Sequence, residues 1–135
     1  MSYGSIRDRL AVRERIEAYG DAVFRRDGEA WIANWADDGV WRLLGAELRG
    51  KQQIKSAWLK AMEPYAHVGF YCVPGHLRID GLRADARVFT REILINHQDK
   101  AVKIMGVYQD RLIKEAGAWL FAERTYALIH SSAAN

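Results

Sequence analysis

The chain has 135 residues, half of them hydrophobic and 27% charged, with a formal net charge of +3. This length is typical of one domain, so we expect a single domain over residues 1–135, with a core that needs no disulfide. There is no apolar run of 18 residues, which excludes a membrane-spanning helix. Basic and acidic residues interleave along the chain, and this pattern disfavours nucleic acid as a partner. The lone Cys72 and an N-terminus without the apolar stretch of a secretion signal predict a cytoplasmic protein.

Helical periodicity dominates the first part of the chain. Ser5 begins a capping-box-like sequence, and apolar residues then recur at helical spacing to about residue 26. The pair Asp27-Gly28 then ends this helix. Asp27 can also cap a second helix, which carries Trp31 and Trp35 four residues apart. We therefore expect two consecutive helices joined at Asp27.

A short strand over 40–44 and a third helix after Gly50, ended by Pro64, complete this region. After Pro64 the pattern becomes alternating, and turn residues separate four long extended runs: 67–80, 83–96, 101–114 and 118–131. Helices first and an antiparallel meander second predict an α+β fold, with three N-terminal helices packed on one face of an antiparallel sheet.

The long strands carry large apolar side chains on both faces. In the last run, Trp119, Phe121 and Ile129 alternate with Leu120, Tyr126 and Leu128. Helices can cover only one face of the sheet, so the other face needs a partner. We therefore expect a homodimer formed through the sheet.

Short motifs along nearly the whole chain resemble one known family. They are Tyr19-Gly20-Asp21, the run from Asp27 to Trp31, the run from Trp35 to Trp41, Gly50-Lys51 with Ile54, Ile79-Asp80-Gly81, the run from Gly106 to Asp110, and Trp119 with Arg124. Together they are similar to the SnoaL-like branch of the nuclear transport factor 2-like superfamily, nearest in spacing to its dehydrochlorinase and scytalone dehydratase members. The resemblance implies a strongly curved sheet wrapped into a cystatin-like cone.

The resemblance also implies site residues. Tyr19 and Asp21 followed by Asp27 reproduce a spacing in which the last carboxylate is catalytic, and Arg124 matches a site arginine. The histidine that pairs with the carboxylate in such relatives falls on Cys72, four residues before His76. This substitution leaves the family's catalytic machinery incomplete in this chain.

The residues themselves allow more than one interpretation of these candidates. Asp27 is either a general base among aromatic side chains or an ordinary helix N-cap. His76 shares strand parity with Cys72, so both could face one cavity, where His76 would relay a proton; the alternative is a structural strand histidine. Arg124 lies in an apolar strand, where it could pair with an acidic residue, orient the base or stabilise a developing anion, and these roles are compatible.

Several aromatic side chains could line a pocket rather than fill the core. The expected catalytic residues are Asp27, His76 and Arg124. The expected substrate-binding residues are Tyr19, Trp41, Trp58, Cys72, Phe89, Tyr108 and Tyr126.

We therefore expect a cofactor-independent lyase or isomerase, of the dehydratase, dehydrohalogenase or cyclase type, acting through an aspartate base on a small hydrophobic cyclic substrate. The alternatives are a non-catalytic small-molecule-binding domain of the same fold and an assembly domain. The sequence has no phosphate loop, nucleophile elbow or zinc cysteine cluster, and His97-Gln98-Asp99 is only a weak metal-like spacing, so we expect no cofactor and no metal.

Overall fold

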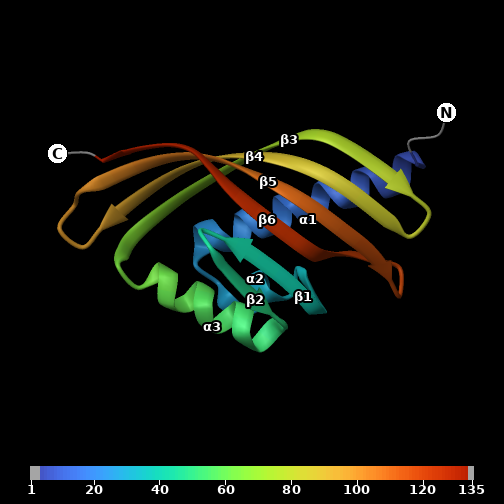
Figure 1. Ribbon diagram of the computed structural model, residues 1–135, viewed down its shortest axis with the longest axis horizontal. Helices are drawn as coiled ribbons and strands as arrows, with labels where there is room; N and C mark the ends of the chain where they lie inside the picture. The colour runs from blue at the N-terminus through green and yellow to red at the C-terminus, as the bar shows by residue number, and fades with distance from the viewer. Residues whose placement is uncertain (1–3, 134–135) are drawn as a thin grey trace.

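The computed structural model describes residues 4–133 and consists of helices under an arched sheet (Figure 1). Over these residues the helices are α1 (Ile6–Arg25), α2 (Gly28–Ile32) and α3 (Lys51–Met62). The strands are β1 (Trp35–Leu43), β2 (Ala46–Arg49), β3 (Tyr65–Asp80), β4 (Arg83–Asn96), β5 (Ala101–Glu115) and β6 (Ala118–Ala133). The predicted α+β class and the order of helices before long strands are confirmed.

The strands form one sheet in the order β2-β1-β6-β5-β4-β3. The four long strands pair antiparallel in a meander, as predicted, but β1 runs parallel to β6. The sheet is therefore mixed and not purely antiparallel. The alternation of apolar and polar residues within a strand indicates which side chains share a face. It does not indicate which distant strand pairs with it, so the parallel pairing of β1 with β6 was not predicted. The short β2 has mostly exposed side chains, so it lacks the apolar pattern that would predict it.

Helix α1 lies under the arch of the sheet and is fixed at both ends (Figure 1). At its start the Ser5 side chain accepts a hydrogen bond from the Asp8 backbone N–H, as the capping sequence predicts. At its end Arg26 adopts a left-handed conformation, and its guanidinium donates to the carbonyls of Met62 and Tyr65. The first helix is thereby tied to the end of α3 and the start of β3.

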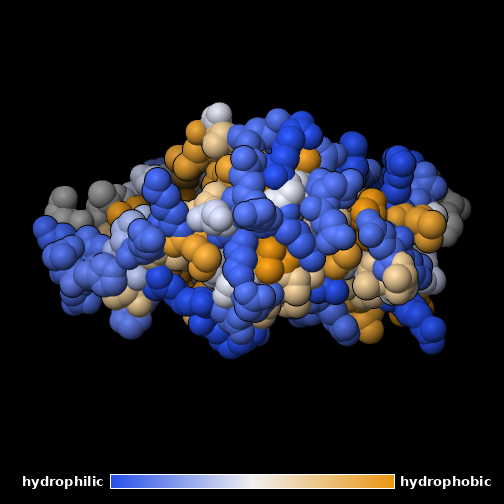
Figure 2. Space-filling view, turned by 90° about the horizontal axis from the view of Figure 1, so that it is seen from below, coloured by the Kyte–Doolittle hydropathy of each residue, from blue (hydrophilic) through white to orange (hydrophobic). Residues whose placement is uncertain are grey.

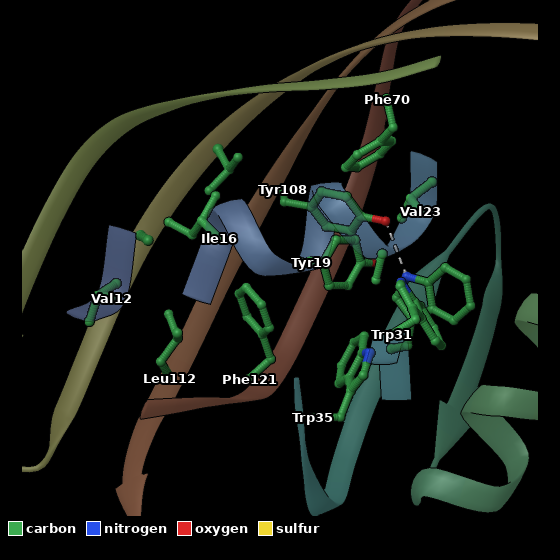
Figure 3. Close-up of a cluster of buried hydrophobic side chains, with 14 of the residues drawn as sticks. Val12, Ile16, Tyr19, Val23, Trp31, Trp35, Phe70, Tyr108, Leu112 and Phe121 are labelled. Carbon is green, nitrogen blue, oxygen red and sulfur yellow. Dashed lines mark hydrogen bonds between the residues drawn. The ribbon is translucent and has the colours of Figure 1, made fainter. Parts of the chain in front are cut away.

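Large aromatic side chains fill the space between α1, α2 and the sheet (Figure 3). Trp31, Trp35, Trp119 and Phe121 are fully buried, and Trp31 stacks on Trp58 with ring centroids 4.6 Å apart. Burial of a large aromatic side chain contributes about 2 to 3 kcal/mol, so this cluster supplies much of the driving force for folding. All five tryptophans are thus buried in this core.

The face seen from below is largely hydrophilic (Figure 2). Seen from the lower edge of Figure 1, hydrophobic residues appear as separate patches among charged ones (Figure 2). None of the described helices is long and apolar enough to cross a membrane.

Candidate functional site

The interior of the arch contains a pocket of about 230 Å³ between α1, α3 and the inner face of the sheet. Its walls are almost entirely aromatic or aliphatic. The lining residues are Tyr19, Val23, Trp41, Leu43, Leu44, Trp58, Ala61, Met62, Tyr65, Val68, Phe70, Glu92, Leu94, Ile104, Tyr108 and Tyr126. Tyr19, Trp41, Trp58, Tyr108 and Tyr126 were expected to bind substrate, and the structure brings these five side chains together around one space.

Glu92 is the one carboxylate among the described residues that line this pocket. It lies on the inner face of β4, where Tyr126 Oη donates to its Oε2 at 3.0 Å and Thr90 Oγ1 donates to the same oxygen at 3.2 Å. Burial raises the pKa of the Glu92 carboxyl, and the two hydroxyl donors oppose that shift only in part. A raised pKa makes a carboxylate a stronger base, which is the property that a general base needs.

The sequence analysis did not identify Glu92, although a signal was present. Along β4 the inward positions are Ala84, Ala86, Val88 and Thr90, which are all buried. Glu92 continues the same parity, so an ionisable residue stands on the apolar face of the strand. A charge on an apolar strand face is uncommon unless it is paired or functional.

Tyr126 reaches Glu92 by crossing the strand between them. Tyr126 is on β6 and Glu92 is on β4, so the ring lies over β5 at Gly106. A Cβ atom at Gly106 would overlap the Tyr126 hydroxyl and ring. The absence of a side chain at Gly106 therefore allows the hydrogen bond between Tyr126 and Glu92.

A second hydroxyl in the pocket belongs to Tyr108. Trp41 Nε1–H donates to Tyr108 Oη at 3.3 Å, and this bond is the dashed line in Figure 3. Because the indole donates, the phenolic proton of Tyr108 is left to donate elsewhere. Burial raises the pKa of Tyr108 well above its usual value and that of Tyr19 to about 12, so both phenols stay protonated.

Arg124 lies behind the tyrosines and does not line the pocket. Its guanidinium carbon is 3.8 Å from the ring centroid of Tyr108 and 4.4 Å from that of Tyr19. The guanidinium forms a bidentate pair with Asp110, with Nε–Oδ1 at 2.7 Å and Nη2–Oδ2 at 2.8 Å, and both side chains are 0% exposed. Burial alone would lower the pKa of Arg124, but the Asp110 carboxylate outweighs it and the net direction is upward. The acidic partner expected for a buried arginine is therefore Asp110.

Asp27 lies outside the pocket, at the N-terminus of α2. Its Oδ1 accepts a hydrogen bond from the Ala30 backbone N–H at 3.1 Å, and Arg25 Nη1 donates to its Oδ2 at 3.0 Å. The side chain is 40% exposed, and the Ala30 N–H followed by the Arg25 guanidinium lowers its pKa. An N-cap side chain must turn back toward its own helix, and this geometry directs Asp27 away from the cavity.

His76 does not share a face with Cys72, because β3 contains a bulge. Pro74 pairs with Val88 and Leu77 pairs with Ala86, so two residues intervene on β3 and one on β4. The extra residue reverses the parity that the sequence analysis used. His76 is therefore exposed on the outer face, next to a shallow polar depression.

Phe89 also lies on the outer face of the sheet, where it is 41% exposed. Its neighbours on β4, Val88 and Thr90, point inward, so alternation places Phe89 outward. The parity of β4 was not assigned at the sequence level, and this register places Phe89 outside the pocket that Glu92 lines.

Cys72 faces inward but packs against α1 and does not line the pocket. A Cβ atom at Gly20 would lie 3.8 Å from its sulfur, which places the thiol against the helix. Burial raises the pKa of the Cys72 thiol to about 11, so it remains a protonated, apolar side chain.

No group of three potential metal ligands occurs among the residues that the structure describes. The weak metal-like spacing at 97–99 lies in the turn between β4 and β5. There the Nε2 of His97 is 2.9 Å from the Glu63 carbonyl oxygen, which indicates a structural hydrogen bond.

Structural similarity to solved proteins is extensive although sequence identity is low. Hexachlorocyclohexane dehydrochlorinase LinA type 2 superposes with a TM-score of 0.86 at 14% identity, covering 96% of this chain and 90% of that one. A putative scytalone dehydratase from Novosphingobium aromaticivorans gives 0.88 at 15% identity, covering 96% and 93%. A ketosteroid isomerase-like protein from Erwinia carotovora atroseptica gives 0.82 at 23% identity, covering 93% and 99%. At these identities the similarity establishes the cone fold alone.

No curated protein matches the chain by sequence. The profile of the SnoaL-like domain, by contrast, matches residues 4–125, which is most of the chain and includes Glu92, Tyr108 and Arg124. The motifs that resembled this family at the sequence level lie within the matched range. The chain therefore belongs to the SnoaL-like domain family.

Proposed function

We propose that this protein is a cofactor-independent lyase or isomerase that removes a proton from a carbon atom of a small, neutral, hydrophobic substrate. One observation carries the proposal: Glu92, a partly buried carboxyl with a raised pKa, lines an otherwise uncharged, apolar pocket together with the phenols of Tyr108 and Tyr126. A carboxyl group that acts as a general base often has a raised pKa, because burial makes its carboxylate more basic. The general base in this scheme is Glu92, while Asp27 and His76 have no part in it.

The pocket limits the size and charge of the substrate. A cavity of about 150 Å³ accommodates benzene, and the volume here is about 230 Å³. This space suits a molecule of one or two rings. No Lys, Arg or His lines the pocket in the described part of the chain, so an anionic substrate would meet Glu92 without a compensating cation.

The hydrogen bonds around Glu92 leave one of its oxygens available. Tyr126 and Thr90 both donate to Oε2, and no described residue donates to Oε1. In the proposed reaction Oε1 takes a proton from a carbon next to a carbonyl group, and the electron pair of that C–H bond moves onto the carbonyl oxygen as an enolate. The enolate then expels a leaving group from the adjacent carbon, or Glu92 returns the proton at another carbon.

Tyr108 is placed to stabilise the negative charge that develops on the substrate. Its oxygen already accepts from Trp41, so its own proton can be donated to the enolate oxygen. The Arg124 guanidinium against the ring favours negative charge on the phenol side of the pocket. Arg124 therefore acts through Tyr108 as a positioning residue.

Hydrogen exchange tests this proposal without the natural substrate. Neutral cyclic ketones such as cyclohex-2-enone and 2-tetralone would be incubated with the protein in D₂O, and loss of the α-proton signal followed by NMR. We expect the wild type to accelerate exchange of at least one ketone, and Glu92→Gln to lose about 100-fold or more of that rate. Asp27→Asn, a matched change in an exposed carboxylate, should retain the rate.

Two outcomes would contradict the proposal. An unchanged rate in Glu92→Gln would show that Glu92 is not the base. Binding of the ketones without any exchange by the wild type is the result expected for the non-catalytic binding domain.

We also propose that the outer face of the sheet pairs with a second copy of the chain. Exposed apolar side chains gather there across β3, β4, β5 and β6: Tyr71, Val73, Phe89, Met105 and Ile129, called here the outer patch. On the same face, Arg87 and Arg111 lie near Asp85 and Glu123, so both signs of charge accompany the patch. A two-fold arrangement can bring such groups into complementary pairs.

The molar mass in solution tests this interface. Sedimentation equilibrium of the wild type should give a dimer, and Phe89→Lys should give a monomer. The control is Leu82→Lys, which changes an exposed apolar residue in the turn between β3 and β4, outside the outer patch. A monomeric wild type, or a dimer that Phe89→Lys leaves intact, would contradict the proposed interface.

A further inference from the structure

The turn between β1 and β2 contains a residue whose backbone is unfavourable for its side chain. Leu43 pairs with Ala46, so Leu44 and Gly45 form a two-residue hairpin turn. Their φ angles are +48° and +83°, which is the pattern of a type I′ turn. Asn, Asp or Gly normally occupies the first position, and a leucine there is uncommon because its Cβ crowds the backbone at positive φ.

Leu44 is also exposed to an unusual extent for a leucine. Its exposed fraction is 76%, yet the side chain lines the pocket that contains Glu92. Leu43 from the same turn region and Met62 from the end of α3 line the pocket as well. The hairpin tip therefore forms part of the rim where the pocket meets solvent.

The same turn geometry occurs once more in a place without a pocket. Ala116 and Gly117 connect β5 to β6, with Glu115 paired to Ala118 and φ angles of +48° and +82°. Neither Ala116 nor Gly117 lines the pocket that Leu44 lines. This second turn carries a small side chain, which shows that the geometry itself does not need a leucine.

We infer that Leu44 is a substrate-contact residue, which covers the apolar end of a ligand bound in the pocket and selects for ligands with such an end. Strained backbone at a pocket rim is typical of functional positions. Covering Leu44 with an apolar ligand would remove its side chain from water, which favours binding. The inference rests on the proposed function only in requiring that the pocket accept a neutral apolar ligand.

The test compares the two turns. Leu44→Asn and the matched control Ala116→Asn both place a residue that tolerates positive φ in the first turn position, so both should raise Tm by roughly 3 °C. Binding of 2-naphthol would be measured by quenching of tryptophan fluorescence, since Trp41 and Trp58 line the pocket. We expect Leu44→Asn to bind 2-naphthol about fivefold more weakly than the wild type, and Ala116→Asn to bind it equally well.

A third variant separates backbone strain from ligand contact. Leu44→Ala keeps a residue with a Cβ at positive φ and removes the apolar side chain, so it should weaken naphthol binding with little gain in Tm.

Three results would overturn the inference: naphthol binding by Leu44→Asn equal to that of the wild type, no naphthol binding by the wild type, or a Tm gain in Ala116→Asn without one in Leu44→Asn. Leu44-dependent binding without Glu92-dependent hydrogen exchange would overturn the proposed enzymatic function and support the role of Leu44.

Discussion

The pair formed by Asp110 and Arg124 allows a quantitative prediction about stability. Both side chains are 0% exposed, and the two hydrogen bonds between them measure 2.7 and 2.8 Å. Asp110→Asn changes the charge with little change in shape, and it leaves the guanidinium buried without a counter-charge. Breaking a buried pair in this way costs about 3–5 kcal/mol of unfolding free energy.

This cost is large compared with the stability of a domain of this size. Unfolding entropy is about 2.1 cal/mol/K per residue, or roughly 280 cal/mol/K for this chain, so the loss corresponds to a fall in Tm of about 10–18 °C. Urea unfolding followed by tryptophan fluorescence would give the free energy, and a thermal melt by circular dichroism would give Tm.

Two further variants test the reasoning. Asp85 and Arg111 form a long, exposed pair at 3.7 Å, so Asp85→Asn should cost no more than about 0.5 kcal/mol. The double variant Asp110→Leu with Arg124→Met removes both buried charges and should recover much of the stability lost by Asp110→Asn. If Asp110→Asn cost less than about 1 kcal/mol, the pair would behave as a surface pair and the reasoning would be refuted.

Three more predictions concern the pocket. Burial raises the pKa of Glu92 above its ordinary value of 4.5. Between the unfolded and the folded pKa the folded protein therefore holds a proton that the unfolded chain has lost, so stability falls as pH rises. Glu92→Gln should melt at a higher temperature than the wild type at pH 8 and at a similar temperature at pH 3. Gly106→Ala should displace Tyr126 from Glu92, and the pH dependence of hydrogen exchange should then shift to higher pH, as it should in Tyr126→Phe. Trp41→Phe removes the donor to Tyr108. Steady-state kinetics should then show a lower kcat and a smaller change in KM.

The sequence predicted the fold well where local patterns determine structure. Ser5 and Asp27 cap helices as expected, because an N-cap depends on a side chain and a backbone N–H three residues away. The four long strands and their turns follow from alternation and from Gly-containing connections. The parallel neighbour of β6 was missed, since the pairing of β1 with a strand about 80 residues later leaves no trace in either segment.

Only some of the residues expected at the site line the pocket, and local geometry explains why the others do not. Tyr19, Trp41 and Tyr108 line the pocket because the helix or strand that carries each of them is regular there. The side-chain direction then follows from the neighbouring buried positions. His76 follows the β3 bulge, where one extra residue reverses the face, and a bulge has no reliable signature in a single sequence. For Asp27 both interpretations were open at the sequence level, and the exposed N-cap geometry is what the structure provides.

The position of Arg124 connects the stability of this fold with the proposed chemistry. A guanidinium inside the pocket would neutralise Glu92 directly, lower its pKa and weaken it as a base. Here Asp110 holds the guanidinium behind the rings of Tyr108 and Tyr19, so the charge reaches the pocket mainly through the phenol that is placed to donate to the substrate. Neutralising Asp110 should therefore alter more than the folding equilibrium: in the fraction that remains folded, the freed guanidinium should lower the pKa of Glu92 and shift the pH dependence of hydrogen exchange to lower pH. A variant that loses stability without this shift would show that the ion pair serves the core alone.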